Sequence, residues 1–211
     1  PMATLIENEM VDTMLKLVGY KAGEGIFTTG GSNGNLLGLM CARDRKFPDA
    51  QRVGFGGKQL VAFISADAHY STAMAANVIG IGLDNLITIS TDERGAMIST
   101  ELQEAIGAEK RAGNYPFCVI GTAGTTVTGA VDPMQELADI CHQEKLWLHI
   151  DAAWGGATLL SPKTRSLLQG IDLADSICWD PHKMMGVHLC CSVFLVKNSG
   201  TLRNVCVHTK K

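Results

Sequence analysis

The sequence predicts an α/β fold built on a mostly parallel, doubly wound sheet with helices on both faces. Short apolar runs that favour buried strands alternate along the chain with segments of helical periodicity. Glycine-rich or polar turns follow several of these runs, as expected for repeated strand–helix–strand units. In such a sheet the residues just past the strand ends converge on one crevice, so those positions hold the candidate functional residues.

The composition is typical of a globular protein and gives no reason to expect a charged macromolecular partner. Of the 211 residues, 46% are hydrophobic and 18% are charged, and the formal net charge is −3. A chain of this length suffices for one large domain. The weak negative charge argues against nucleic acid or anionic membrane as partners. No apolar run reaches the roughly 18 residues that a membrane-spanning helix needs.

The cysteines indicate a reducing compartment. There are seven, an odd number, with no CxxC pair, and most lie inside apolar segments. This pattern fits buried thiols better than a disulfide framework or a zinc site. We therefore expect a cytoplasmic protein without a metal centre.

The first part of the chain predicts a helix at 4–18 and then a glycine-rich turn at 25–35 that opens a helix at 36–43. Such a turn exposes backbone N–H groups at the positive end of the helix, which is a natural seat for a phosphate. Ser32 or Asn33 can also cap this helix. For the turn alone, a plain helix cap is the simpler interpretation.

The rest of the chain alternates strands with helices. Proline and glycine predict a surface loop at 47–58. Strands are predicted at 60–65, 86–90, 117–121, 146–150, 175–179 and 189–196. Helices are predicted at 72–79, 99–112 and 134–145, with a short one at 162–169 and an irregular tail at 201–211.

Three chemistry-bearing side chains, His69, Asp151 and Lys183, stand just after predicted strands. Each has a plainer interpretation: a structural cap for the histidine and the aspartate, and a side chain reaching solvent for the lysine. Lys183, however, lies between two apolar runs, and an unpaired ammonium is costly to bury. We therefore expect Lys183 to be shielded from water and to have a chemical role.

Together, the strand-end residues suit one cofactor. They comprise a phosphate seat at 30–35, an aromatic ring, a carboxylate, a lysine and the hydroxyls of Thr125 and Thr126. Proteins that bind pyridoxal phosphate hold its phosphate at a helix N-terminus. A lysine forms a Schiff base with the cofactor, and an aspartate pairs with its ring nitrogen. The convergence of these groups, rather than any single motif, predicts a pyridoxal phosphate site.

Several motifs carry a family resemblance: GGSNGN (30–35), AHYS (68–71), DERG (92–95), TAGTTVTGAVDP (122–133), HIDAAWGG (149–156) and DPHKMMG (180–186). From about residue 5 to about residue 200, the sequence resembles the group II pyridoxal-phosphate-dependent amino-acid decarboxylases. Within that group it is most similar to the glutamate and cysteine-sulfinate decarboxylase branch. The HIDAAWGG and DPHK signatures are the most specific of these motifs.

The resemblance implies a fold and a set of catalytic residues. Residues 1–200 would form the large, cofactor-binding domain of a fold type I pyridoxal-phosphate-dependent enzyme. Lys183 would form the Schiff base with the cofactor, and Asp151 would pair with the pyridine nitrogen. His69 would stack on the ring face opposite Ala153.

The resemblance also implies contacts at the edges of the cofactor. Ser32, Asn33 and His182 would hold the phosphate, and Thr126 would lie near the ring or its O3′ oxygen. The implied reaction is decarboxylation of an L-amino acid, with an acidic substrate (glutamate, aspartate or cysteine sulfinate) preferred. The small amino acid would be the partner of the site, and the full-length form would be a homodimer.

Two alternatives stay open at this point. One is another fold type I enzyme, such as an aminotransferase or a cysteine desulfurase, since these enzymes use an aspartate and a lysine in the same way. Fold alone does not determine which reaction is catalysed. A chain that binds the cofactor without turning over substrate is the second alternative. The residues of the AWGG and PHK motifs argue against another fold type I reaction. The presence of Lys183, Asp151 and His69 together argues against a chain that only binds the cofactor.

The sequence departs from the family pattern in two ways. Residue 180 is aspartate where the animal members carry asparagine, and a carboxylate cannot donate a hydrogen bond to a phosphate. The tyrosines are Tyr20, Tyr70 and Tyr115, so none follows Lys183, where the family places a protonating tyrosine. We therefore expect a truncated chain that lacks an N-terminal segment and a small C-terminal domain and is inactive by itself.

Overall fold

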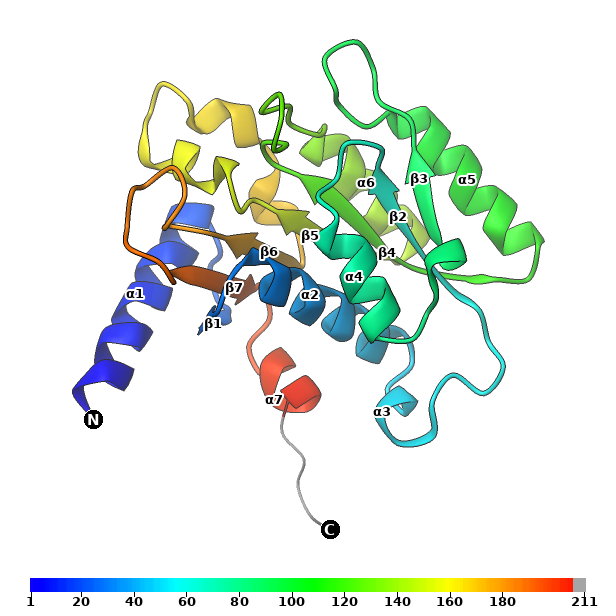
Figure 1. Ribbon diagram of the computed structural model, residues 1–211. Coiled ribbons are helices and arrows are strands. Elements are labelled where there is room, and N and C mark those ends of the chain that lie inside the picture. Colours follow the sequence, from blue (N-terminus) through cyan, green and yellow to red (C-terminus); the bar gives the residue numbers. More distant parts are fainter. Residues whose placement is uncertain (207–211) are drawn as a thin grey trace.

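The computed structural model describes residues 1–206, and within them seven strands form one sheet (Figure 1). The strands are β1 (Glu24–Thr28), β2 (Leu60–Ser65), β3 (Leu86–Ile89), β4 (Tyr115–Thr122), β5 (Trp147–Asp151), β6 (Ser176–Trp179) and β7 (Ser192–Val196), in the order β1-β7-β6-β5-β4-β2-β3. Neighbours in the run from β6 to β3 are parallel, and β7 is antiparallel to both β6 and β1. The predicted mostly parallel sheet is confirmed.

Helices cover both faces of the sheet, as predicted (Figure 1). The α-helices are α1 (Met2–Val18), α2 (Gly31–Lys46), α3 (Ala50–Val53), α4 (Ser71–Val78), α5 (Ser99–Arg111), α6 (Met134–Glu144) and α7 (Thr201–Cys206). Short 3₁₀ helices are η1 (Leu83–Asn85), η2 (Gly155–Leu160), η3 (Arg165–Leu168) and η4 (Ile171–Leu173). Among the described residues, no helix has both the length and the apolar character of a membrane span.

Two buried apolar clusters hold these layers together. One joins α2 and α4 to one face of the sheet and includes Leu39, Phe117 and Phe194. The other joins α1, α5 and α6 to the opposite face and includes Leu102 and Leu137. Burial of apolar surface on both faces is what makes the central strands almost wholly apolar.

Helix α2 packs unusually close to the sheet because two glycines face it. A Cβ added at Gly34 would lie 2.5 Å from the Sγ atom of Cys178 on β6. One added at Gly38 would lie 2.7 Å from the imidazole ring of His149 on β5. Only glycine permits this approach, which brings the first turns of α2 against the carboxyl ends of β5 and β6.

Strand β1 is the main element that the sequence did not predict. All its residues but Glu24 fall within the stretch expected to be a glycine-rich turn, yet β1 pairs with β7 from Glu24 opposite Val196 to Thr28 opposite Ser192. The partner strand lies far along the chain, so no local pattern indicates this pairing.

The C-terminal region also differs from expectation. Residues 183–190 are exposed, and β7 begins at Ser192 rather than at 189, because the apolar side chains after Lys183 do not pack on the sheet. The first part of the predicted irregular tail is helix α7, whose Val205 is buried beside α2. The remainder of that tail, 207–211, lies outside the described residues.

Candidate cofactor site

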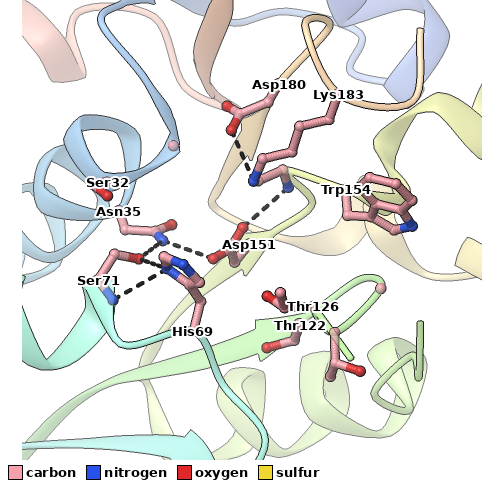
Figure 2. Close-up of a pocket in the computed structure, with 14 residues that line it drawn as sticks. Ser32, Asn35, His69, Ser71, Thr122, Thr126, Asp151, Trp154, Asp180 and Lys183 are labelled. Atoms are coloured by element: carbon pink, nitrogen blue, oxygen red, sulfur yellow. Dashed lines mark hydrogen bonds and ion pairs between the residues drawn. The ribbon is translucent and has the colours of Figure 1, made fainter. Parts of the chain in front are cut away.

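A cavity of about 240 Å³ opens where the carboxyl ends of β4, β5 and β6 meet the N-terminus of α2 (Figure 2). This is the edge at which a doubly wound sheet gathers ligand-binding residues. The lining residues come from five separate stretches of the chain: Gly31, Ser32, Asn35, His69, Ser71, Thr122, Gly124, Thr125, Thr126, Asp151, Ala153, Trp154, Asp180 and Lys183. The convergence expected from the sequence is therefore observed for most of the candidates.

Asp151, the last residue of β5, is held rigidly at the cavity wall. Its side chain is 6% exposed, and both carboxylate oxygens accept hydrogen bonds from nitrogen. The backbone N–H of Ala153 donates to Oδ1 at 3.1 Å, and the Asn35 amide donates to Oδ2 at 2.7 Å. These two donors fix the orientation of the Asp151 carboxylate at the cavity wall.

Lys183 follows β6 and reaches the same cavity. Its Nζ atom lies 3.1 Å from Oδ2 of Asp180, whose side chain is only 2% exposed. The Ser192 hydroxyl donates to the other oxygen of Asp180 at 2.5 Å. The lysine side chain is 36% exposed, so the expectation that Lys183 is shielded from water is wrong. Its amine is instead held by an ion pair at the cavity edge.

His69 lies between β2 and α4, with its ring in the cavity wall (Figure 2). The Nδ1 atom is 2.8 Å from the Ser71 hydroxyl oxygen. The backbone carbonyl of His69 accepts hydrogen bonds from the N–H and the hydroxyl of Thr72. His69 thus caps the start of α4 with its backbone, while its ring lines the cavity and packs against the Tyr70 ring, with 4.2 Å between the ring centroids.

The N-terminus of α2 opens into the cavity through Gly31 and Ser32. The helix begins at Gly31, and within the described residues no side chain caps it, so the predicted cap by Ser32 or Asn33 is wrong. The carbonyl of Gly30 accepts the N–H groups of Asn33 and Gly34. The earlier N–H groups have no intrahelical acceptor and remain available for an anion.

The end of β4 supplies hydroxyl groups to the opposite wall. Thr122, Thr125 and Thr126 all line the cavity. Within residues 1–206, the buried hydroxyl oxygen of Thr122 has no hydrogen-bond partner. The hydroxyl of Thr125 bonds to that of Thr128 at 2.8 Å, which leaves Thr122 and Thr126 as the polar groups open to a ligand.

Two predicted cofactor contacts fall outside the lining of the described cavity. Asn33 is half-buried in the first turn of α2. His182 directs Nδ1 at the backbone of Cys191, with 2.6 Å to the carbonyl oxygen, and its Nε2 lies 3.7 Å from Asp180. The structure therefore brings together Ser32, His69, Thr126, Asp151, Ala153 and Lys183, but not these two.

Sequence reasoning missed Asn35, Ser71 and Trp154 as residues of the site. Asn35 hydrogen-bonds both Asp151 and Ser71, whose hydroxyl bonds His69 (Figure 2). Each of the three lies inside a motif noted in the sequence, GGSNGN, AHYS or HIDAAWGG. The motifs therefore pointed to the right segments, but only the packing of α2 on β5 shows that Asn35 contacts Asp151.

The chain is similar to known decarboxylases in sequence and in structure. Residues 1–210 match the family described as pyridoxal-dependent decarboxylase conserved domain. The chain is 44% identical over 207 residues to acidic amino acid decarboxylase GADL1 of Bos taurus, which covers 98% of this chain and 40% of that protein. It thus spans less than half the length of this curated relative.

Two crystal structures have the same fold as the chain. Mouse CSAD in apo form matches with a TM-score of 0.95 and 39% identity, over 98% of this chain and 44% of that one. The glutamate decarboxylase domain of a Vibrio parahaemolyticus protein, titled diaminobutyrate-pyruvate transaminase and L-2,4-diaminobutyrate decarboxylase, matches with a TM-score of 0.93 and 32% identity, over 97% of this chain and 46% of that one. Since the family match covers nearly every residue, the chain belongs to the pyridoxal-dependent decarboxylase family.

Proposed function

We propose that the chain binds pyridoxal 5′-phosphate in this cavity and serves the decarboxylation of an acidic L-amino acid to its amine and CO₂. One observation carries the proposal: the Lys183 amine and the Asp151 carboxylate line one cavity, into which the N-terminus of α2 also opens. Family membership supports the cofactor, because the family is described as pyridoxal-dependent. The AWGG and PHK motifs support decarboxylation over the other fold type I reactions.

The residues present fit each part of the cofactor. The free N–H groups of α2 at Gly31 suit a phosphate, and the Lys183 amine suits an aldehyde carbon. The buried carboxylate of Asp151 suits a protonated ring nitrogen. The unpartnered hydroxyl of Thr122 offers a hydrogen bond that no described protein group uses. The wall formed by the His69 ring suits the flat face of a pyridine.

The protein side chains then have distinct tasks. When bound, pyridoxal phosphate supplies an electron sink for the electron pair left as CO₂ departs. Asp151 holds a proton on the ring nitrogen, because a neighbouring negative charge favours that charged form. Lys183 would hold the cofactor at its aldehyde carbon, the atom that the substrate amine must also reach. His69 would cover one face of the ring, opposite Ala153, and would exclude water from it.

The remaining proposed contacts concern the edges of the cofactor. Ser32 contacts the phosphate from the first turn of α2, and Thr126 contacts the edge of the ring from the turn after β4. The proposed phosphate contacts of Asn33 and His182 rest on the sequence resemblance alone, because neither residue lines the described cavity.

The net reaction needs one proton from outside these residues. The bond between Cα and the carboxylate carbon breaks, and its electron pair stays with the substrate while CO₂ leaves. One proton then adds to Cα, so each turnover consumes one proton. The family resemblance places a protonating tyrosine after Lys183, and the tyrosines of this sequence are Tyr20, Tyr70 and Tyr115.

The acidic substrate class, the homodimer and the cytoplasmic location are also proposals. The name of the Bos taurus relative, acidic amino acid decarboxylase, supports an acidic substrate. Exposed apolar residues on α1, Met2, Leu5 and Ile6, are available to pack against a second copy. All seven cysteines of the chain are free, which suits a reducing compartment. Light scattering would test the dimer through its molar mass.

The function is tested by product formation in the full-length gene product. With pyridoxal phosphate present, we expect amine and CO₂ from at least one of L-glutamate, L-aspartate and L-cysteine sulfinate, and none from L-leucine. Lys183→Ala should abolish the product, whereas Lys163→Ala, in an exposed loop, should leave the rate unchanged. Turnover that survives Lys183→Ala, or the absence of product from all three acidic substrates, would contradict the proposal.

A further inference from the structure

A buried hydrogen-bonded network lies beneath the cavity, and of its members only Asp151 and His69 have a role in the reaction steps above. It runs from β6 through β5 and α2 to the start of α4 (Figure 2 shows the part nearest the cavity). Apart from the His69 ring, each of its side chains belongs to a residue exposed by 6% or less. The members are Trp147, Ser176, His149, Asn35, Asp151, Ser71 and His69.

The strand geometry explains why these side chains meet. Trp147, His149 and Asp151 alternate along β5, so all three face the helix α2. Ser176 on β6 stands directly opposite His149 in the sheet register. Gly38, one turn beyond Asn35 on α2, leaves room for the His149 ring.

The carboxylate of Asp151 fixes the orientation of the Asn35 amide. An ionised carboxylate only accepts hydrogen bonds, so the amide nitrogen of Asn35 must face it. That nitrogen donates to Asp151 Oδ2 at 2.7 Å and to the Ser71 hydroxyl at 2.9 Å. The amide oxygen of Asn35 is then left facing Nε2 of His149 at 2.9 Å.

His149 must therefore carry its proton on Nε2, because an amide oxygen accepts and cannot donate. Burial lowers the pKa of His149 to about 4, so the ring is neutral near pH 7 and its Nδ1 is an acceptor. The indole N–H of Trp147 only donates, and it donates to the Ser176 hydroxyl oxygen at 2.8 Å. The hydroxyl hydrogen of Ser176 then goes to His149 Nδ1, which is 2.8 Å away.

The other branch of the network ends at His69. The Ser71 hydroxyl oxygen accepts from Asn35, so its own hydrogen is free to be donated to His69 Nδ1. The backbone N–H of Ser71 points at the same nitrogen at 3.3 Å. Nδ1 of His69 is thus an acceptor, and the proton of a neutral ring resides on Nε2.

We propose that Asn35 and His149 are positioning residues that act as a unit: His149 sets the direction of the Asn35 amide, and Asn35 thereby fixes both the Asp151 carboxylate and the His69 ring. The inference deepens the proposed function and rests on it for the roles of Asp151 and His69. A single amide joins the carboxylate at the cavity wall to the ring that faces the ligand. Losing the His149 donor would free the amide to rotate and leave Asp151 without its side-chain donor.

The proton positions test the network directly in the protein without cofactor. In protein labelled with ¹⁵N-histidine, nitrogen chemical shifts should report His149 and His69 as Nε2–H tautomers at pH 7. Asn35→Leu, which removes the acceptor for Nε2, should move the His149 proton to Nδ1, where the Ser176 oxygen can accept it. A wild-type His149 protonated on Nδ1, or a tautomer unchanged in Asn35→Leu, would overturn the inference. The wild-type spectrum decides alone if the variant does not fold.

A matched pair of substitutions separates positioning from packing. The amide nitrogen of His149→Gln can take the place of Nε2 as donor to Asn35, whereas His149→Leu fills similar space without a donor. We expect His149→Leu to weaken pyridoxal phosphate binding about tenfold or more, since an unpaired buried polar group costs on that order. His149→Gln should stay within about threefold of wild type. Equal affinity in all three proteins, or equal losses in both variants, would refute the positioning role.

The two measurements also separate this inference from the proposed function. A wild-type protein that binds no pyridoxal phosphate would refute the proposed function, and the tautomer measurement would still decide the network. Conversely, normal cofactor binding with a His149 proton on Nδ1 would refute the network and leave the proposed function intact.

Discussion

Two buried carboxylates, Asp151 and Asp180, face the cavity with different partners. Asp151 accepts hydrogen bonds from Asn35 and from the backbone of Ala153, so its charge is directed at a ligand. Asp180 is paired with Lys183 and hydrogen-bonded by a serine, so its charge is directed at the lysine. In the proposed function, the same residue type thus holds a ligand proton in one place and a protein amine in the other.

Replacing Asp151 should separate cofactor binding from turnover. Asp151→Ala removes the negative charge that holds a proton on the ring nitrogen but leaves Lys183 and the N-terminus of α2 in place. We expect the variant to retain some cofactor and to lose about 100- to 1,000-fold in kcat, the usual scale for one preorganised charged group. Absorbance titration and product assay on the same sample check both parts. A near-normal kcat would refute the assignment.

Replacing Asp180 should strengthen phosphate binding. A Cβ at Gly31 would lie 2.8 Å from Asp180 Oδ2, so this carboxylate stands beside the proposed phosphate seat. Asp180→Asn removes that repulsion, which for two charges about 4 Å apart lies between about 1 kcal/mol in water and about 4 kcal/mol near a protein surface. We expect about tenfold tighter binding of pyridoxal phosphate.

Phosphate-free pyridoxal is the control for Asp180→Asn. If the effect is repulsion of the phosphate, the affinity for pyridoxal should change little. An equal gain for both ligands would place the effect at Lys183 instead. Weaker binding of pyridoxal phosphate would show that the carboxylate helps to hold the site together.

At this scale the sequence located the reactive residues but not their supports. Lys183, Asp151 and His69 could be found because each follows a strand. Asn35 could not, because its contact with Asp151 depends on how closely α2 approaches β5, which no local pattern expresses. The alternation of Trp147, His149 and Asp151 does show that the three share a face of β5.

Among the elements, α2 has the largest part in shaping the site. Its N-terminus opens into the cavity, its Asn35 contacts the carboxylate on β5, and its glycines set its distance from the sheet. A change in the distance between α2 and the sheet would therefore move the proposed phosphate seat and the Asn35 side chain that supports Asp151 together.

Matched glycine substitutions test that contact. At Gly38 an added Cβ would meet the His149 ring at 2.7 Å, so Gly38→Ala should lower the free energy of unfolding by about 1–3 kcal/mol. At Gly107 on α5 the nearest atom is the end of the flexible Arg111 side chain, at 3.1 Å. Gly107→Ala should therefore stabilise the protein, by about 0.5–1 kcal/mol, through helix propensity. Urea denaturation measures the free energy of unfolding of both variants. A Gly38→Ala variant as stable as wild type would contradict the close packing of α2 on His149.

The elements that sequence reasoning placed well are those with strong local periodicity. Strands β2 to β6 and helices α4 to α6 lie within a few residues of their expected positions. Strand β1 was missed because its pairing with β7 is entirely non-local. The apolar residues after Lys183 predict a buried run that the structure does not show, because apolar composition alone does not indicate whether the sheet covers a segment.

For the molecule as a whole, two buried titratable groups act on stability in opposite directions. Burial lowers the pKa of His149 to about 4 and raises the pKa of Asp132 to about 6. Between about pH 4 and 6.5 the unfolded chain binds the His149 proton more readily, so this group loses stability as the pH falls. Between about pH 3.8 and 6 the folded protein binds the Asp132 proton more readily, so that group gains stability as the pH falls.

Single substitutions should reveal the two opposing contributions. Each shift of two to three pKa units corresponds to about 3 kcal/mol. As the pH falls from 7 to 4, the stability that His149→Gln loses relative to wild type should shrink progressively. Over the same range, Asp132→Asn should become progressively less stable relative to wild type. Denaturant midpoints at several pH values measure both differences. Parallel pH profiles for wild type and His149→Gln would show that His149 is not buried in neutral form.

The most direct test of the whole account is where the protein binds its cofactor covalently. Purified protein is mixed with pyridoxal phosphate, its absorbance spectrum is recorded before and after borohydride, and the adduct is mapped by mass spectrometry. The account predicts a Schiff-base band that borohydride converts to one stable adduct on Lys183. Absence of the band, or label scattered over exposed lysines such as Lys163, would contradict it.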